Sequence, residues 1–304
     1  MKDRFDIPIL FIIFNRPLHT ATTFEAIRVM RPARLFVAAD GVREDHEGDA
    51  VNCPQCREIV QQIDWDCKVE YLFREKNLGC KHAVAGAITW FFEQVEMGII
   101  LEDDCLAEKG FFIFCETLLK HYAADENIMH IGGTNFQEHH NLLHQSYYFS
   151  RVPHVWGWAS WSRAWTKYNM SIPDFSAGKL KKIFGDFHFP SVSFHYWKHV
   201  LTQVQQNKLD TWDYQWTYTI WKNKGLVITP EINMISNIGF DHTATHTTVA
   251  ESPYANMPIF NMEHVSHPSA VTVDHKKDVY IFKKWFVKKT IRKKILNRIK
   301  KLFS

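Results

Sequence analysis

The chain has 304 residues, of which 46% are hydrophobic and 14% aromatic. This composition is sufficient for one large core and excludes an intrinsically disordered chain, which requires low hydrophobicity and high net charge. The net charge of +3 is unevenly distributed, because residues 276–304 hold twelve Lys/Arg and one acid, so the first 275 residues carry −8. An acidic body of this kind argues against a nucleic-acid-binding body.

The first 135 residues alternate short apolar runs with amphipathic stretches. Strands are predicted at residues 7–14, 35–39, 68–73, 99–101 and 128–131, and helices at residues 18–30, 57–63, 80–95 and 110–122, with Pro54 marking the start of the second helix. Fully apolar strands that alternate with helices predict an α/β fold with a mostly parallel sheet covered on both faces. The first run is eight residues long, which is too short to span a membrane and fits a buried strand.

Residues 135–230 have a different composition. Eight of the eleven tryptophans lie in this stretch, and helices are predicted at residues 192–206 and 214–224. We interpret this stretch as a second half that packs on the first within a single domain. Cys53 and Cys56 have the spacing of one half of a zinc ribbon, but no second CxxC follows, so we expect reduced thiols and leave metal binding there open.

Charged residues follow three of the predicted strands. They are Arg16 after the first strand, Asp40 after the second, and Glu102, Asp103 and Asp104 after the fourth. Ligands of an open parallel sheet bind outside the carboxyl ends of its strands, so we expect these side chains at one rim. Three adjacent carboxylates repel one another, and Mn²⁺ or Mg²⁺ would relieve this while substrate phosphates supply the remaining ligands. The alternative is a solvated acidic turn before the helix at residues 110–122, where negative charge is also favourable.

Seven short motifs occur in an order that resembles a known family. They are Phe-Asn-Arg-Pro (14–17), Ala-Asp-Gly (39–41), Asn-Leu-Gly-Cys (77–80), Leu-Glu-Asp-Asp-Cys (101–105), Val-Trp-Gly-Trp (155–158), Thr-Trp-Asp (211–213) and Asn-Ile-Gly-Phe (237–240). The set is similar to N-acetylglucosaminyltransferase I and its bacterial relatives, the nucleotide-diphospho-sugar transferases. The resemblance covers residues 8 to about 247 and implies a GT-A (Rossmann-like) fold and inverting transfer of a sugar, GlcNAc or a related hexose, from a UDP-sugar.

The resemblance also implies roles for individual residues on the donor side. Arg16 and Asp40 would contact the uracil end of the donor, Asp103 the ribose, Glu102 the transferred sugar, and Asp104 would be the one protein carboxylate on the metal. His82 lies near a family histidine that touches the nucleotide, although the local spacing differs and a surface position on a helix is the alternative. The turn formed by Trp156, Gly157 and Trp158 is expected to shape the sugar pocket, because glycine permits close approach and tryptophan offers an apolar face.

Asp213 is the expected catalytic base, because the family's Trp-Asp base falls at this point in the motif order. Such a base accepts the proton of the acceptor hydroxyl as it attacks the anomeric carbon. The alternative for Asp213 is a helix cap, which is also the role expected of Asp210 at the helix at residues 214–224. Tyr214 replaces a second acid of the family, which affects the expected acceptor contacts. His242 and His246, in a polar loop, are candidates for phosphate or metal contacts.

The C-terminal residues combine an apolar stripe with many basic residues. Val287, Ile291, Ile295 and Ile299 recur every four residues among Lys and Arg, which is typical of a helix lying on an anionic membrane. Docking on another subunit or on nucleic acid is the alternative. We therefore expect a cytoplasmic protein attached peripherally to the inner face of the membrane, with a glycan or lipid-linked acceptor in bacterial surface polysaccharide synthesis.

These expectations divide the chain into a glycosyltransferase domain at residues 1–262, with a nucleotide-binding half at about 1–135 and an acceptor half at about 136–262, and a linker with a basic tail at 263–304. Two other functions remain open. One is a non-catalytic, membrane-associated protein that binds nucleotide sugars or glycans. The other is a nucleotidyltransferase, which would need a glycine-rich loop after the first strand, and residues 15–18 contain no glycine.

Overall fold

The computed structural model describes residues 4–137, 145–240 and 254–287. Its strands are β1 (Ile9–Ile13), β2 (Arg34–Ala39), β3 (Lys68–Phe73), β4 (Met97–Glu102), β5 (Cys105–Ala107), β6 (Ile128–Gly132), β7 (Tyr147–Ser150), β8 (Trp158–Trp161), β9 (Leu226–Pro230) and β10 (Ile235–Asn237). Its helices are α1 (Pro17–Met30), α2 (Asp49–Ile59), α3 (Gly79–Phe92), α4 (Lys109–His121), α5 (Ser162–Trp165), α6 (Ala177–Asp186), η1 (Ser191–Ser193), α7 (Phe194–Gln205), α8 (Asp213–Lys222) and α9 (His275–Trp285).

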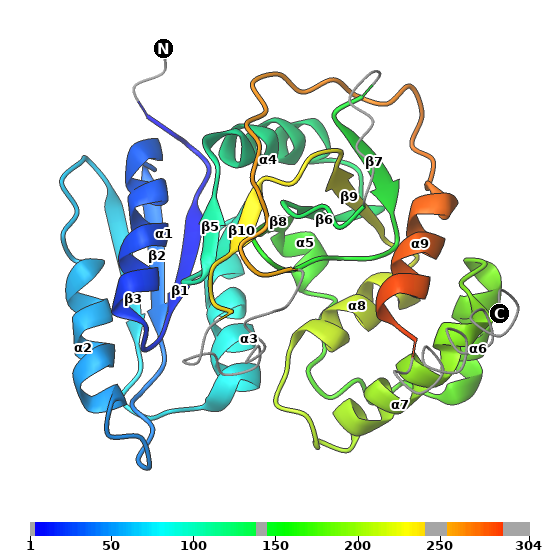
Figure 1. Ribbon diagram of the computed structural model, residues 1–304, viewed down its shortest axis with the longest axis horizontal. Helices are drawn as coiled ribbons and strands as arrows, with labels where there is room; N and C mark the ends of the chain where they lie inside the picture. The colour runs from blue at the N-terminus through cyan, green and yellow to red at the C-terminus, as the bar shows by residue number, and fades with distance from the viewer. Residues whose placement is uncertain (1–3, 138–144, 241–253, 288–304) are drawn as a thin grey trace, which may run out of the picture.

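One eight-stranded sheet organises the described residues, in the order β3-β2-β1-β4-β8-β6-β9-β7 (Figure 1). The strands β3, β2, β1 and β4 are parallel to one another, as are β6 and β9, while β8 and β7 pair antiparallel with their neighbours. The short strands β5 and β10 form a separate antiparallel pair. The mostly parallel sheet predicted from the sequence is thus confirmed.

Successive residues of the strands face two separate cores, as the period-two geometry of a strand requires. In β1, Leu10 and Ile12 pack with residues of α3 and α5–α9 on one face of the sheet. Ile9, Phe11 and Ile13 pack with residues of α1, α2 and α4 on the other face. Both faces are therefore covered, which explains why the strands contain apolar residues almost without interruption. This mostly parallel α/β sheet with both faces covered is consistent with the GT-A (Rossmann-like) fold expected from the sequence.

Two helices differ from the sequence-based predictions. Helix α2 begins at Asp49, eight residues before the predicted start at residue 57, and Pro54 lies inside it. Its start is held by Asp49, whose carboxylate accepts hydrogen bonds from Asn15 and Arg43, and these contacts come from outside the helix. Helix α9 was expected to belong to a tail outside the core, and this is wrong.

Helix α9 packs against the body of the protein. Ile281 and Phe282 are buried, and the ring of Phe282 lies 4.3 Å from that of Phe189 and 6.0 Å from that of Trp221, measured between centroids. Asp278 is also buried, with Ser150 donating to one carboxylate oxygen at 2.5 Å. Figure 1 shows the helix beside α6, α7 and α8. The many basic residues of α9 made it resemble a surface helix in the sequence, although one face of it is buried. Residues 291, 295 and 299 of the expected apolar stripe lie outside the described residues.

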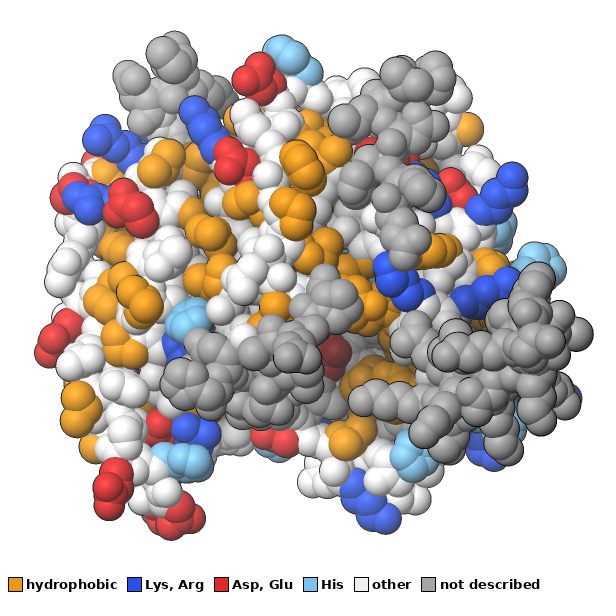
Figure 2. Space-filling model, in the orientation of Figure 1, with side chains coloured by type: hydrophobic (Ala, Val, Ile, Leu, Met, Phe, Trp, Pro, Cys, Tyr) orange, Lys and Arg blue, Asp and Glu red, His pale blue; other side chains and the backbone are white. Residues whose placement is uncertain are grey.

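Among the described residues, no helix is both long enough and apolar enough to cross a membrane. On the face drawn in Figure 2, acidic and basic side chains of the described residues are interspersed. The described part of that face is therefore not uniformly basic.

Candidate active site

A cavity of about 490 Å³ opens at the carboxyl ends of β1, β2 and β4, which is within the size range of small-molecule sites. Six of the residues proposed from the sequence line it: Arg16, Asp40, Glu102, Asp103, Asp104 and Asp213. The strands β2, β1 and β4 are adjacent and parallel, so the residues that follow them meet at one edge of the sheet. Asp213 reaches the cavity from α8, in the other half of the chain.

The acidic run after β4 is held by contacts from the segment after β1. The backbone N–H of Phe14 donates to Asp103 Oδ2 at 3.2 Å, and Arg16 Nη1 donates to Asp104 Oδ2 at 3.1 Å. Burial, followed by the negative charge of Asp104, raises the pKa values of Glu102 and Asp103. The expected repulsion between neighbouring carboxylates is thus present, and Arg16 offsets part of it.

Asp40 organises the loop that precedes α3. Its carboxylate accepts hydrogen bonds from the backbone N–H groups of Leu78 at 2.9 Å and Gly79 at 3.2 Å. Burial raises the pKa of Asp40, and these backbone bonds oppose the shift. Gly41 is required beside it, because a Cβ atom there would lie 2.3 Å from the carbonyl carbon of Lys76. The Ala-Asp-Gly and Asn-Leu-Gly-Cys motifs are therefore in direct contact with each other.

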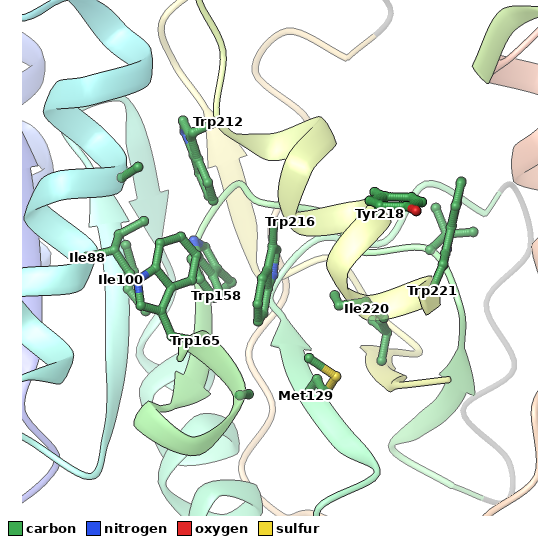
Figure 3. Packing of buried hydrophobic residues seen from close by; sticks show 14 of the residues in the cluster. Ile88, Ile100, Met129, Trp158, Trp165, Trp212, Trp216, Tyr218, Ile220 and Trp221 are labelled. Carbon is green, nitrogen blue, oxygen red and sulfur yellow. The ribbon is translucent and has the colours of Figure 1, made fainter. Parts of the chain in front are cut away.

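Asp213 is the first residue of α8 and lines the cavity, where its negative charge contributes to the raised pKa of Glu102. Thr211 Oγ1 donates to Asp213 Oδ1. Trp212, between them in sequence, is buried and stacks on Trp158 with ring centroids 5.7 Å apart and planes at 22° (Figure 3). Tyr168 Oη donates to the carbonyl oxygen of Trp212 at 3.2 Å. The segment that carries Asp213 is therefore anchored through an aromatic cluster.

The residues predicted to shape the sugar pocket lie behind the cavity wall. Trp158 is 1% exposed and stacks on Trp212, while the tryptophans that line the cavity are Trp156 and Trp212. Gly157 has φ of +59°, and a Cβ atom there would lie 2.5 Å from Ile235 Cδ1. The turn thus requires glycine for packing against Ile235, and of the two tryptophans predicted to shape the sugar pocket only Trp156 lines the cavity.

His82 and Asp210 also differ from expectation. His82 is exposed on α3 and does not line the cavity, so it occupies the surface position considered as its alternative. Asp210 was expected to cap the helix that begins near Tyr214. It lines the cavity and accepts hydrogen bonds from the backbone N–H groups of Cys80 at 3.0 Å and Lys81 at 2.9 Å, so it caps α3 instead.

Two arginines in the cavity were not identified from the sequence. Arg43 forms two hydrogen bonds with the carboxylate of Asp49, at 2.6 and 2.9 Å, and thereby lowers the pKa of that carboxyl group. Arg74 directly follows β3, is half-buried, and lies in the electrostatic field of Asp40. The signal for Arg74 was its position after a parallel strand, the same signal that identified Arg16 and Asp40.

The Asn-Ile-Gly-Phe motif closes one side of the site. Asn237 lines the cavity, and the N–H of Ile238 donates to the carbonyl oxygen of Asp104 at 2.9 Å. A Cβ atom at Gly239 would lie 2.3 Å from Asp104 Oδ2 and 2.4 Å from Arg16 Nη1, so this position needs glycine. Residues 242 and 246, the two histidines predicted to touch phosphate or metal, lie outside the described residues.

The described residues contain no group of three or more His, Cys, Asp or Glu side chains arranged to hold a metal ion. Cys53 and Cys56 are buried free thiols whose pKa values burial raises to about 11 and about 12, so both are protonated at neutral pH. Thiolate, the form that binds zinc, is therefore disfavoured at this pair.

No protein-family model and no curated protein matches the chain. Solved structures that the chain matches include residues 1–349 of S. aureus TarS, with a TM-score of 0.42 and 10% identity over 74% of this chain. They also include galactosyltransferase LgtC in complex with donor and acceptor sugar analogues, with a TM-score of 0.38 and 10% identity over 95% of this chain and all of LgtC. A third is UDP-glucose pyrophosphorylase complexed with UDP-glucose, with a TM-score of 0.36 and 10% identity over 74% of this chain and 90% of that one.

The chain spans 57% of the TarS chain that it matches. At TM-scores below 0.5 and 10% identity, these likenesses carry no argument, and the case for a function rests on the site.

Proposed function

We propose that the chain is a metal-dependent glycosyltransferase that moves a sugar from a UDP-sugar to a glycan or lipid-linked acceptor with inversion. The observation that carries the proposal is the composition of the cavity walls. Charged residues after β1, β2 and β4 form what we call the donor wall, and Asp213, a carboxylate on α8, lines the same cavity. Such a cavity brings groups suited to hold a donor together with a group suited to accept a proton.

The donor wall extends from Arg74 after β3 to Asp104 after β4. Three interstrand spacings of about 4.8 Å separate these strands, which is room for a nucleoside diphosphate lying across the strand ends. Arg74, Asp40 and Arg16 would bind the nucleoside end, as the family resemblance implies for the last two. Glu102 would then lie toward the transferred sugar.

The residues present fit a single hard cation on Asp104. Its Oδ2 accepts a hydrogen bond from Arg16. Its Oδ1 accepts only a weak hydrogen bond from the Cys105 thiol, whose Sγ lies 3.6 Å away. One carboxylate oxygen is thus suited to a divalent cation whose other ligands are phosphate and water oxygens. Bound Mn²⁺ or Mg²⁺ would neutralise charge on the diphosphate leaving group.

The protein itself contributes the group that accepts the proton of the acceptor hydroxyl. As the acceptor hydroxyl oxygen bonds to the anomeric carbon, its proton passes to Asp213, and the bond from that carbon to the diphosphate breaks with the electron pair leaving on the nucleoside diphosphate. The hydrogen bond from Thr211 to Asp213 Oδ1 orients the carboxylate. Trp156 and Trp212 supply apolar surface beside it and limit access of water.

A binding experiment tests the donor wall and the metal together. UDP at about one hundred times its Kd should stabilise the protein by about 2.7 kcal/mol in Mn²⁺ and by clearly less in EDTA. Asp104→Asn keeps an oxygen for Arg16 but is a poor cation ligand, so it should abolish the difference between Mn²⁺ and EDTA. Thermal-shift titration measures both effects, with Asp66→Asn, an exposed carboxylate away from the cavity, as the control. Equal stabilisation in Mn²⁺ and EDTA would contradict the role of Asp104.

A further inference from the structure

The first turn of α3 lies between the donor wall and the segment that carries Asp213. The first four N–H groups of a helix have no partner inside it, and here they belong to residues 78–81. Asp40 accepts from the first two of them, and Asp210 accepts from the last two. Two carboxylates, one after β2 and the other 170 residues later, therefore share the start of one helix.

We propose that Asp210 is a positioning residue that holds the segment 207–213, and with it Asp213, against the start of α3 at the cavity. The inference rests on the proposed function, in which Asp213 is the base. Three residues of chain span at most about 10 Å, so Asp213 stays close to wherever Asp210 is fixed. A displacement of about 1 Å between a base and its substrate is enough to lower a rate by about 10²-fold.

Further contacts show that this junction is built for close approach. Lys81 is 5% exposed, and its Nζ donates to Asn207 Oδ1 at 2.8 Å, which ties the beginning of the same segment to α3. Gly79 has φ of +76°, and a Cβ atom there would lie 3.0 Å from Asp210 Oδ2. Glycine at position 79 thus allows both the left-handed backbone and the approach of the Asp210 carboxylate.

The same arrangement has a consequence for the donor. The N-terminus of a helix beside a parallel sheet often binds phosphate through its free N–H groups. In α3 these groups are already bonded to Asp40 and Asp210, and two carboxylates there repel a diphosphate. The start of α3 therefore joins the two halves of the site and is not itself a phosphate site.

The test compares Asp210→Ala with a matched capping variant, Asp274→Ala. Asp274 accepts from the N–H groups of Lys276 and Lys277, both at 3.1 Å, in the first turn of α9 and away from the cavity. Each variant removes one carboxylate from two backbone N–H groups, so both should lower Tm by about 2–4 °C. Asp210→Ala should also lower kcat about tenfold or more with donor Kd unchanged, whereas Asp274→Ala should leave kcat unchanged.

Hydrogen exchange measured on the full chain supplies a readout that does not depend on turnover. Asp210→Ala should accelerate exchange at residues 78–82 and 207–216, and Asp274→Ala only in α9. Gly79→Ala, which crowds the Asp210 carboxylate, should reproduce the loss of kcat seen in Asp210→Ala. Asp210→Asn keeps one accepting oxygen and should retain more activity than Asp210→Ala.

Three results would overturn the proposal. The first is an unchanged kcat in Asp210→Ala, because Trp212 packing would then suffice to hold the segment. The second is a loss in Asp210→Asn as complete as in Asp213→Asn, because Asp210 would then be the proton acceptor. The third is unchanged exchange at residues 207–216 in Asp210→Ala. The exchange measurement does not depend on catalysis, so it tests whether Asp210 holds the segment even if the wild-type protein turns over no nucleotide sugar. Absence of turnover in the wild-type protein would refute the proposed function and not the role of Asp210.

Discussion

Asp213→Asn should lower kcat by about 10²-fold or more and leave donor affinity within about twofold. Asparagine preserves the size of the side chain and keeps an oxygen for the hydroxyl of Thr211, which bonds to Asp213 Oδ1. It cannot accept the proton of the acceptor hydroxyl. Because Asp213 lies on α8 and does not follow one of the strands that carry the proposed donor contacts, binding of the nucleotide should not change. Steady-state kinetics and a direct titration of UDP measure the two effects separately.

The control for this variant is Asp186→Asn, which changes an exposed aspartate bonded to Lys182 at the end of α6. It should behave as wild type in both assays. Near-normal turnover in Asp213→Asn would assign the base to another residue. A parallel loss of UDP affinity would instead show that Asp213 contacts the donor.

Removing α9 should unfold or aggregate the protein, because α9 packs against the body of the protein instead of belonging to a separate tail. Burial of Ile281 and of Phe282 contributes about 1.5–3 kcal/mol each, and the bonds from Ser150 and Arg151 to Asp278 would also be lost. These losses are comparable to the whole stability of a typical domain. Circular dichroism and denaturant unfolding of a chain ending at Asp274 test this expectation.

A chain ending at residue 287 is the matched control, because it retains all of α9 and should unfold cooperatively like the full chain. Phe282→Ala in the full chain should lower the free energy of unfolding by about 3–5 kcal/mol.

The residues removed in the control, 288–304, contain eight Lys/Arg and no acid. We propose that they bind anionic membrane surfaces, so the control should no longer sediment with anionic vesicles. A folded chain ending at Asp274 would contradict the structural role of α9.

The sheet and the donor wall were predictable from the sequence because they follow from local rules. Apolar runs separated by amphipathic helices predict parallel strands, and parallel strands place Arg16, Asp40 and the acidic run at one edge. Arg74 obeys the same rule, but β3 itself contains Lys68 and Glu70, so a further charged residue after it does not stand out in the sequence.

The remaining differences depend on tertiary contacts that no local pattern contains. Trp156 and Trp158 are two residues apart, and the position of β8 between β4 and β6 decides which of them is covered. Asp210 caps a helix that begins 131 positions earlier in the chain, so its local sequence indicated α8 as its partner. The buried face of α9 consists only of Asp278, Ile281 and Phe282, and the lysines around them gave the helix the composition of a surface helix.

The most direct test of the central claim is turnover of nucleotide sugars by the full chain. A panel of UDP-sugars, with Mn²⁺ and a pool of glycan and lipid-linked acceptors, should yield UDP from at least one donor. The transferred sugar should have the inverted anomeric configuration by NMR, and Asp213→Asn should release UDP about 10²-fold more slowly. A protein that binds UDP-sugars but releases no UDP with any acceptor would be a binding protein. Formation of pyrophosphate from a nucleoside triphosphate and a sugar phosphate would make it a nucleotidyltransferase, and either result would contradict the account.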